Sequence, residues 1–477
     1  MIFNSVQFLI FFVIVYSLYL KLPHKGQNRM LLVASYIFYG AWDWRFLSLI
    51  ILSTIIDYYC GIFVHESKEP QQKKRFVTIS MLSNLMILLF FKYFNFFAAN
   101  LQGLLNVFGL QVPSFYLDII LPMGISFYTF QTMSYTIDIY RRELKPTRNF
   151  LDFALFVSFY PQLVAGPIER AKHLLPQILN PRKVNLESFY EGMFLMFWGL
   201  FQKVVIADNL AQIVDPLFIK NPPYNGVAVY ITMVAFTFQI YCDFAGYSNI
   251  ARGLGKVMGF DIMINFNLPF FVTNIQDYWN RWHISLSSWI RDYLYVPLFK
   301  YLRKVKGQAR IYSALMISMT LIGLWHGASW NFVIFGVYYG LLLVAYVIIR
   351  SRCHSWIQPK SVAGKSIWHW TRVIFMFHLI MIGMLLFRVQ YGAQIYLMLK
   401  GVFLDFQFLP EHKFLALKTF YFIWILLLVQ FFQYFKKDLL CVYRAPFFVR
   451  VAFYLICFFL ITIHGVTGEK EFIYFQF

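Results

Sequence analysis

His326 is the residue of this chain best placed for acid/base chemistry, because it stands alone in a long apolar run. Between Ile311 and Ile349 it is the only Asp, Glu, Lys, Arg or His. A run of this length belongs in a bilayer, where an ionisable group is costly and usually functional. Arg310 precedes it by sixteen residues. On a straight helix His326 would therefore lie about 24 Å from a charged surface, past the middle of a core roughly 30 Å thick. We expect a proton-transfer group at membrane depth that can meet substrates from opposite sides.

The residues around His326 predict two helices that meet near the histidine. Gly327 favours a helix break, and the polar Ser329 and Asn331 follow it. Irregular backbone at membrane depth is tolerated where it is buried in protein or lines a cavity, so a break here is compatible with a site. Trp325 and Asn331 flank the break and are candidate site residues beside His326.

The densest group of polar side chains lies between Asn274 and Asp292 and contains a second histidine. Aromatic and charged residues alternate there, as in an amphipathic segment at a membrane face or along a wet cavity. On a helix His283 and Ser287 would share a face, while Arg281 would project elsewhere. An interfacial helix anchored by tryptophans is the structural alternative, but it does not need a histidine beside a cation. The candidate residues are Asn280, Arg281, Trp282, His283, Ser285 and Asp292.

Two further polar stretches lie among apolar residues. Residues 160–170 contain two prolines and a glycine, which predicts either a simple loop or a re-entrant turn with Glu169 and Arg170 at its mouth. Asp243 follows the apolar segment 227–242. We expect it at the end of that segment, either in a structural ion pair with a cation such as Arg252 or in the site.

Composition requires that these residues be positioned by membrane helices. The chain is 60% hydrophobic and 13% charged over 477 residues, which is too apolar for an ordinary soluble protein. The apolar segments predict an all-α integral membrane protein with about 11 to 13 transmembrane and re-entrant helices.

Charge placement predicts the topology of the chain. The net charge is +20, and most of the Lys and Arg clusters fit cytoplasmic loops if residues 42–45 form a tight outer turn and the N-terminus lies outside. A basic cytoplasmic face would also attract an anionic phosphorylated donor. No nucleic-acid partner is expected. The five cysteines form no Cys-x-x-Cys pair, and we expect neither a disulfide framework nor a metal site.

The most distinctive segments of the chain are residues 279–287, 291–298 and 323–331. These three segments closely resemble the membrane-bound O-acyltransferase family, and above all its bacterial alginate O-acetyltransferase branch. The turn 165–170, the segment 243–248 and the closing residues 472–477 also match. With matches from residue 31 onward, the resemblance covers nearly the whole chain.

The resemblance implies a ring of tilted helices around a thin catalytic centre, with a cytoplasmic and an extracytoplasmic funnel. His326 matches the family's catalytic histidine and His283 its second motif histidine. The implied donor is acetyl-CoA, with no permanently bound cofactor. The acetyl group would pass outward to a separate extracytoplasmic acetyltransferase that decorates a polysaccharide. Residues 1–477 would then form one polytopic domain, with a motif core at about 160–340, in a bacterial cytoplasmic membrane.

The expected reaction is transfer of an acetyl group from a thioester to a hydroxyl. A neutral His326 would accept the hydroxyl proton, and His283, Arg281 or Asn331 would orient it or hydrogen-bond the developing oxyanion. An alginate-type exopolysaccharide is the first expectation for the acceptor, with peptidoglycan or cellulose as alternatives. A transporter is the rival class, because carriers also have many helices, broken segments and midplane polar groups. A structural scaffold would leave His326 unexplained.

Overall fold

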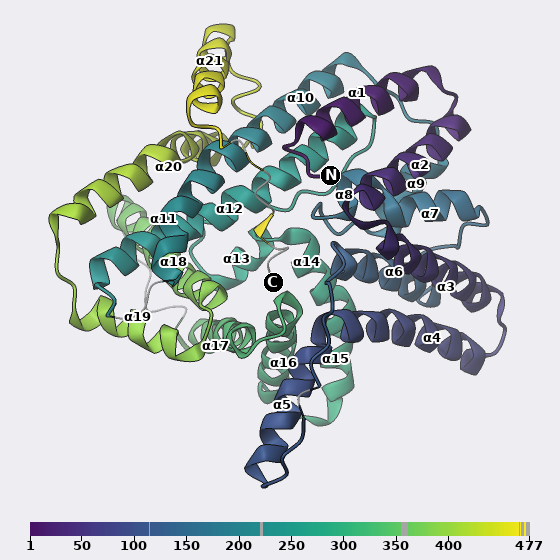
Figure 1. Ribbon diagram of the computed structural model, residues 1–477, viewed down its shortest axis with the longest axis horizontal. Helices are drawn as coiled ribbons and strands as arrows, with labels where there is room; N and C mark the ends of the chain where they lie inside the picture. The colour runs from purple at the N-terminus through teal and green to yellow at the C-terminus, as the bar shows by residue number, and fades with distance from the viewer. Residues whose placement is uncertain (114, 220–222, 354–360, 467, 469–471, 474–477) are drawn as a thin grey trace. The chain divides into compact units, whose positions relative to one another are not determined.

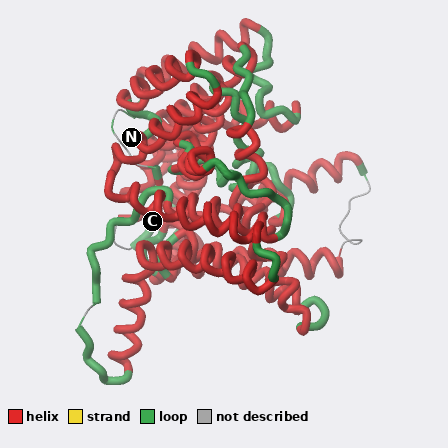
Figure 2. Tube along the Cα trace, turned by 90° about the vertical axis from the view of Figure 1, so that its right-hand side faces the viewer, coloured by secondary structure: helices red, strands yellow, loops and turns green. Residues whose placement is uncertain are grey.

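Helices are the only regular secondary structure in the described residues. The computed structural model describes residues 1–477 except 114, 220–222, 354–360, 467, 469–471 and 474–477. Within these ranges no strand is present (Figure 2). This agrees with the predicted all-α class, because a helix satisfies its own backbone hydrogen bonds in hydrocarbon.

The chain divides into two compact units. The first contains Met1–Met196 and Ile250–Met263, and the second contains Phe197–Asn249 and Ile264–Phe477. These units are defined by packing, whereas an acyltransferase domain is defined by function. The two units therefore do not test the expectation of a single acyltransferase domain, which stays a prediction.

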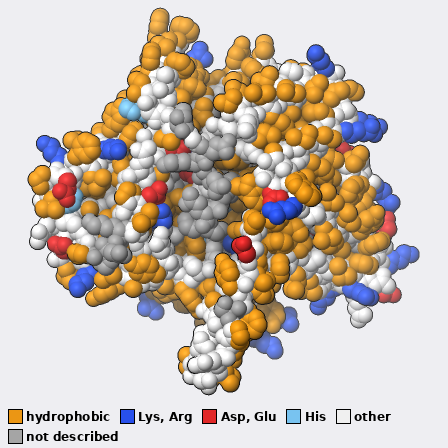
Figure 3. All heavy atoms as spheres, in the orientation of Figure 1, with side chains coloured by type: hydrophobic (Ala, Val, Ile, Leu, Met, Phe, Trp, Pro, Cys, Tyr) orange, Lys and Arg blue, Asp and Glu red, His pale blue; other side chains and the backbone are white. Residues whose placement is uncertain are grey.

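Eight helical segments in the described residues are long and apolar enough to cross a membrane. Figure 3 shows hydrophobic side chains over much of the visible surface, as expected for helices that face lipid. Three shorter apolar helices cover Val6–Lys21, Phe150–Leu163 and Gly392–Leu404. The eight segments are His24–Glu66, Pro70–Val107, Leu186–Ile219, Gly226–Val257, Trp330–Arg352, Val362–Arg388, Pro410–Lys436 and Phe447–His464.

The first unit is formed by the N-terminal helices and the end of a long later helix. The predicted tight turn at residues 42–45 is present, and Arg45 pairs there with Asp43 at 2.6 Å. The helices are α1 (Val6–Lys21), α2 (His24–Asp43), α3 (Leu47–Glu66), α4 (Pro70–Leu88), α5 (Phe94–Val107), α6 (Ile125–Tyr140), α7 (Phe150–Ser158), α8 (Tyr160–Leu163), α9 (Ala171–Leu179), most of α10 (Leu186–Phe201) and the end of α12 (Gly226–Val257).

A buried polar cluster joins α3, α4 and α6 in this unit. Asp57 is fully buried, and its carboxylate accepts hydrogen bonds from Ser80 and, at 2.7 Å, from Asn84. Ser53 and Thr132 donate to the amide oxygen of Asn84 at 2.8 and 3.3 Å. Polar contacts of this kind hold membrane helices together, because hydrocarbon offers the same groups no partner.

The second unit carries both histidines of interest. Its elements include two π-helical turns, η3 (Gln202–Ala207) and η4 (Arg291–Tyr295). The helices, besides parts of α10 and α12, are α11 (Asp208–Ile219), α13 (Ile275–Arg281), α14 (Ile284–Ile290), α15 (Val296–Tyr301), α16 (Ala309–His326), α17 (Trp330–Cys353), α18 (Val362–Arg388), α19 (Gly392–Leu404), α20 (Pro410–Lys436) and α21 (Phe447–His464).

Helices α16 and α17 lie side by side (Figure 1), and glycines bring their backbones into contact. A methyl group at Gly323 would overlap the carbonyl oxygen of Phe332, and one at Gly336 would overlap that of Met319. Such close approach is the usual function of small residues between membrane helices. The glycines therefore fix the position of the C-terminal end of α16.

Gly336→Ala should destabilise the protein, whereas Gly340→Ala on the same helix should not. Overpacking a tight contact costs about 1–3 kcal/mol. At Gly340 the added methyl would meet mainly the flexible side chain of Met316, with its sulfur at 2.9 Å, and alanine is a better helix former by about 1 kcal/mol. The midpoint of thermal unfolding in detergent should fall for the first variant and hold or rise for the second. Equal midpoints would contradict this account of the helix contact.

Candidate functional site

His326 is the last residue of α16, at the helix break that the sequence predicts. Helix α17 begins at Trp330, so residues 327–329 form the connection. Asn331, at the start of α17, donates its side-chain N–H to the carbonyl oxygen of Val389 at 2.7 Å. The amide of Asn331 thus anchors the connection to the end of α18.

Aromatic rings surround the imidazole of His326. The residue is only 5% exposed. Its ring centroid lies 5.0 Å from Trp325, 5.6 Å from Phe335 on α17 and 5.2 Å from Phe387 on α18, each edge to face. These rings exclude water from the imidazole and restrict its orientation.

His283 lies in a sharp joint between α13 and α14. Its backbone has φ 46° and ψ 53°, the left-handed region that non-glycine residues rarely adopt. The sequence-based interpretation of His283 and Ser287 on one continuous helical face is therefore wrong. Residues before the joint replace the lost helical bonds: Ile284 N–H donates to the carbonyl of Asn265 at 2.9 Å, and Asn267 N–H to that of Arg281 at 3.0 Å.

The two histidines share a neighbour, Trp325. The centroid of His283 lies 6.3 Å from Trp325, which also contacts His326, and 4.6 Å from Phe244 on α12. His283 is 1% exposed and lies outside the eight candidate spans. Burial lowers the pKa of His283 to about 3, so the imidazole is neutral at physiological pH. A neutral imidazole carries one N–H donor and one acceptor nitrogen.

A cavity of about 390 Å³ runs along α16 toward the histidines. Its wall on α16 contains Ile311, Leu315, Ser318 and Ile322, which recur at the spacing of one helical face. At one end Ile322 lies one turn before His326, and Ile284 directly follows His283. The other end reaches the start of α16, which contains Arg310 in its first turn and follows the basic residues Lys300, Arg303, Lys304 and Lys306.

The remaining candidates between 280 and 292 have different surroundings. Asn280 lines the cavity. Trp282 is buried and stacks on Tyr278 at 5.7 Å. Arg281 pairs with Asp277 at 3.1 Å on the same helix. Ser285 donates to the side-chain oxygen of Asn265 at 2.6 Å, and Asp292 pairs with the preceding Arg291 at 2.8 Å. Arg281, Ser285 and Asp292 thus have structural partners, while Asn280 borders the open space.

Asp243 forms a buried ion pair, but with Lys203 rather than Arg252. The ammonium of Lys203, in the π-helical turn η3, lies 2.7 Å from Asp243 and 2.9 Å from Asp208. Helix α12 continues to Val257, so Asp243 lies within it and not at its end. The structural ion pair expected for Asp243 is therefore present, but its cation is Lys203, from a segment about forty residues earlier, and not Arg252.

Asp243 also holds the end of the chain. Its second carboxylate oxygen accepts the backbone N–H of Ile473 at 2.7 Å. The ring of Phe472 contacts Phe244 at 5.3 Å, and Phe244 in turn contacts His283. The C-terminal segment therefore supports the wall behind His283.

The sequence analysis did not identify Lys203 or Phe244 as site residues. The signal for Lys203 was a lysine in an apolar helix, and the signal for Phe244 was its place beside Asp243 in a segment that matches the family. Residues 474–477 of the matching C-terminal motif lie outside the described residues.

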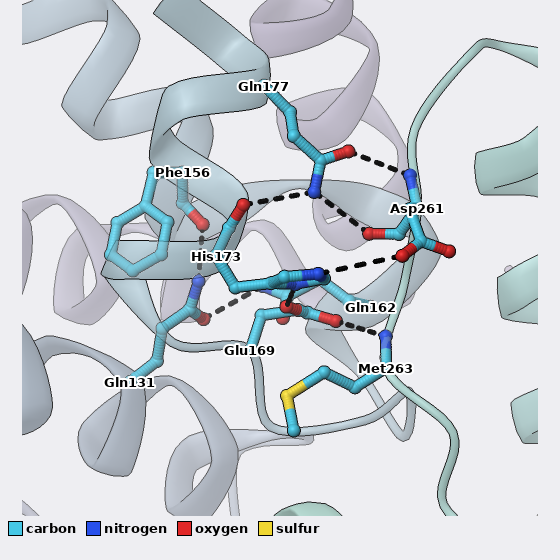
Figure 4. A network of polar contacts seen from close by, with 8 residues as sticks. All are labelled: Gln131, Phe156, Gln162, Glu169, His173, Gln177, Asp261 and Met263. Atoms are coloured by element: carbon cyan, nitrogen blue, oxygen red, sulfur yellow. Dashed lines mark hydrogen bonds and ion pairs between the residues drawn. The ribbon is translucent and has the colours of Figure 1, made fainter.

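Glu169 and Arg170 belong to the first unit and are buried. Glu169 is 0% and Arg170 5% exposed. Figure 4 shows His173 of α9 between Glu169, at 2.7 Å, and Asp261, at 3.7 Å. The other oxygen of Glu169 accepts the N–H of Met263 at 2.6 Å. These bonds draw the turn inward, which the spacing of prolines and glycine cannot reveal.

The pKa values of His173, Asp261 and Glu169 in this cluster are shifted from their ordinary values. Hydrogen bonds to Asp261 and Glu169 raise the pKa of His173 to about 10. The hydrogen bond from His173 lowers the pKa of Asp261, whereas burial raises that of Glu169. At neutral pH a charged imidazole thus bridges two acidic side chains.

Two other histidines in apolar segments lie within hydrogen-bond distance of tyrosine hydroxyls. His378 lies 2.9 Å from the hydroxyl of Tyr230, and His464 lies 2.8 Å from that of Tyr421. Among the described residues no group of three or more His, Cys, Asp or Glu side chains is placed to bind a metal ion.

Comparison with known proteins places both histidines in matched sequence. The membrane-bound O-acyltransferase family model matches residues 36–389. The probable alginate O-acetylase AlgI of Azotobacter vinelandii is 39% identical over 393 residues, covering 82% of this chain and 75% of that protein. The protein of the same name from Pseudomonas aeruginosa is 38% identical, with 82% and 72% coverage. A Helicobacter pylori peptidoglycan O-acetyltransferase is 34% identical, with 76% and 72% coverage.

The His173 bridge predicts a pH-dependent contribution to stability. Its folded-state pKa of about 10 lies above the ordinary histidine value of about 6.5. The stabilisation is therefore complete below about pH 6.5 and is lost as the pH rises through about 10. The difference in unfolding midpoint between wild type and His173→Gln should shrink over this interval. A difference that stays constant from pH 6.5 to 10 would show that the charge of His173 does not contribute.

Proposed function

The chain belongs to the membrane-bound O-acyltransferase family and is an acyltransferase, and we propose that it transfers acetyl groups from acetyl-CoA for O-acetylation of a cell-surface polysaccharide. The observation that carries the proposal is the position of His326: a buried imidazole at a helix break, one turn beyond a cavity that reaches the basic segment 300–310. The chain is a multi-pass membrane protein, and we place it in a bacterial cytoplasmic membrane.

His326 acts as the general base in this proposal. The imidazole accepts the proton of the acceptor hydroxyl while the oxygen attacks the thioester carbonyl. Collapse of the tetrahedral intermediate breaks the carbon–sulfur bond, and the imidazolium returns its proton to the thiolate of CoA. The products are an acetyl ester and CoA. The aromatic rings around His326 exclude water, which would otherwise compete with the hydroxyl.

His283 is our candidate for stabilising the oxyanion. Arg281 and Asn331, the two other residues expected for this role, have structural partners in Asp277 and Val389. His283 is buried, neutral and against the same tryptophan as His326. In a site that excludes water, an N–H donor does not compete with solvent for the developing oxyanion. A single donor of this kind stabilises the transition state by about 3–4 kcal/mol.

The cavity along α16 is suited to the narrow arm of acetyl-CoA. Ile311 and Ile322 lie eleven positions apart, which on a helix is about 16 Å. The phosphates of CoA would remain at the basic segment 300–310, where Lys and Arg side chains attract anions. The pantetheine arm would then carry the acetyl group up the cavity toward His326.

The acceptor is proposed from the relatives. Two of the compared proteins are named for alginate acetylation and one for peptidoglycan acetylation. We place an alginate-type exopolysaccharide first, because those relatives have the higher identity. We also propose a separate extracytoplasmic acetyltransferase as partner, which would receive the acetyl group and set the specificity for the polymer.

Cells that lack this gene should lose an alkali-labile acetyl ester from one envelope polysaccharide. Wild type should restore the ester, and His326→Ala at matched protein level should not, because the proton acceptor is missing. The measurement is acetate released by mild alkali from separated glycans, and the responding fraction identifies the polymer.

His378→Ala is the matched control, since this histidine is exposed and lies within hydrogen-bond distance of the hydroxyl of Tyr230. It should restore the ester like wild type. Full restoration by His326→Ala would refute the mechanism. If no fraction changes its acetate content, the acetylation proposal fails and a transporter becomes the better explanation.

A further inference from the structure

Two buried polar groups in the wall of the α16 cavity have no partner among the described residues. The hydroxyl of Ser318 and the indole N–H of Trp279 make no hydrogen bond within that part of the chain. Ser318 is only 3% exposed. Both residues line the cavity. They lie on different elements, α16 and α13, and face the same space.

Groups of this kind indicate a ligand. Leaving a buried donor unsatisfied costs about 1–3 kcal/mol, and a serine in a helix commonly bonds to the carbonyl one turn earlier instead. The α16 side of the cavity is otherwise apolar, with Leu315, Met319 and Ile322 beside Ser318. A ligand at this level must therefore be mostly apolar and must present a hydrogen-bond acceptor to Ser318 and Trp279.

We infer that Ser318 and Trp279 bind an amide carbonyl in the pantetheine arm of the acyl donor, an inference that rests on the proposed function. Trp279 donates from its indole N–H and Ser318 from its hydroxyl, both toward a carbonyl oxygen. The ring of Trp279 is held in place by Tyr278 and Tyr339, with centroids at 5.3 and 5.1 Å. The contact fixes how far the donor enters the cavity.

The position of Ser318 indicates which of the two pantetheine amides it binds, namely the one farther from the sulfur. Ser318 precedes His326 by eight residues on one helix, which corresponds to about 12 Å along the axis. In an extended pantetheine arm the nearer amide carbonyl lies about 5 Å from the sulfur and the farther one about 10 Å, using standard bond geometry. With the thioester at His326, the farther carbonyl reaches the level of Ser318.

Substrate truncation tests the assignment. Ser318→Ala should lower kcat/KM about tenfold for acetyl-CoA and for S-acetyl-pantetheine, the size expected for one lost hydrogen bond. It should leave kcat/KM unchanged for S-acetyl-N-acetylcysteamine, which lacks the farther amide. Trp279→Phe, which keeps a ring and loses the N–H, should show the same pattern. Ser313→Ala is the matched control on α16, because Ser313 is outside the cavity wall.

The outcomes separate this inference from the proposed function. The assignment would be overturned if Ser318→Ala lost kcat/KM equally with the long and the short thioesters, or lost none with either. The proposed function would still stand in that case, provided that the wild-type protein transfers acetyl. If wild type transfers acetyl from none of the three thioesters, the proposed function fails and this inference with it. A defect in Ser313→Ala as large as that of Ser318→Ala would also overturn the assignment.

Discussion

The contact between α16 and α17 is the constraint on which the candidate site depends. Gly323 and Gly336 let the two backbones touch, so that any larger residue would overlap a carbonyl group of the facing helix. With the helices held at this distance, the chain must turn within residues 327–329. His326 is thereby placed at the end of a helix rather than along its side. The ring of Phe335 on α17 and that of Phe387 on α18 then close around the imidazole.

A second constraint is that polar groups in an apolar environment must find partners within the protein. The left-handed joint at His283 is possible because Asn265 supplies both backbone and side-chain bonds to residues 284 and 285. Asp243 is stabilised by Lys203 and by the backbone of Ile473. These bonds replace water, and they also position the rings that separate and support the two histidines. The residues that supply partners to these buried polar groups therefore also set the geometry of the site.

The sequence predicted those features that depend on local pattern. Apolar runs indicated an all-α membrane protein, and Gly327 with its polar neighbours indicated the helix break beside His326. The contacts that it could not predict are mainly those between distant segments. The joint at His283 needs Asn265, the partner of Asp243 comes from another helix, and Glu169 bonds to Met263. Only the contact of Glu169 with His173, four residues later, lies at a helical spacing that periodicity can detect.

Label transfer in membrane vesicles can show whether His326 transfers the proton during acetyl transfer. Vesicles from cells that make the polysaccharide would receive acetyl-CoA labelled in the acetyl group, and the label in alkali-labile ester would be measured over time. Loss of a general base lowers the rate by about 10²–10⁴. We expect a loss of this size for His326→Ala, and a rate within a few-fold of wild type for His378→Ala. A wild-type rate for His326→Ala at equal protein would contradict it.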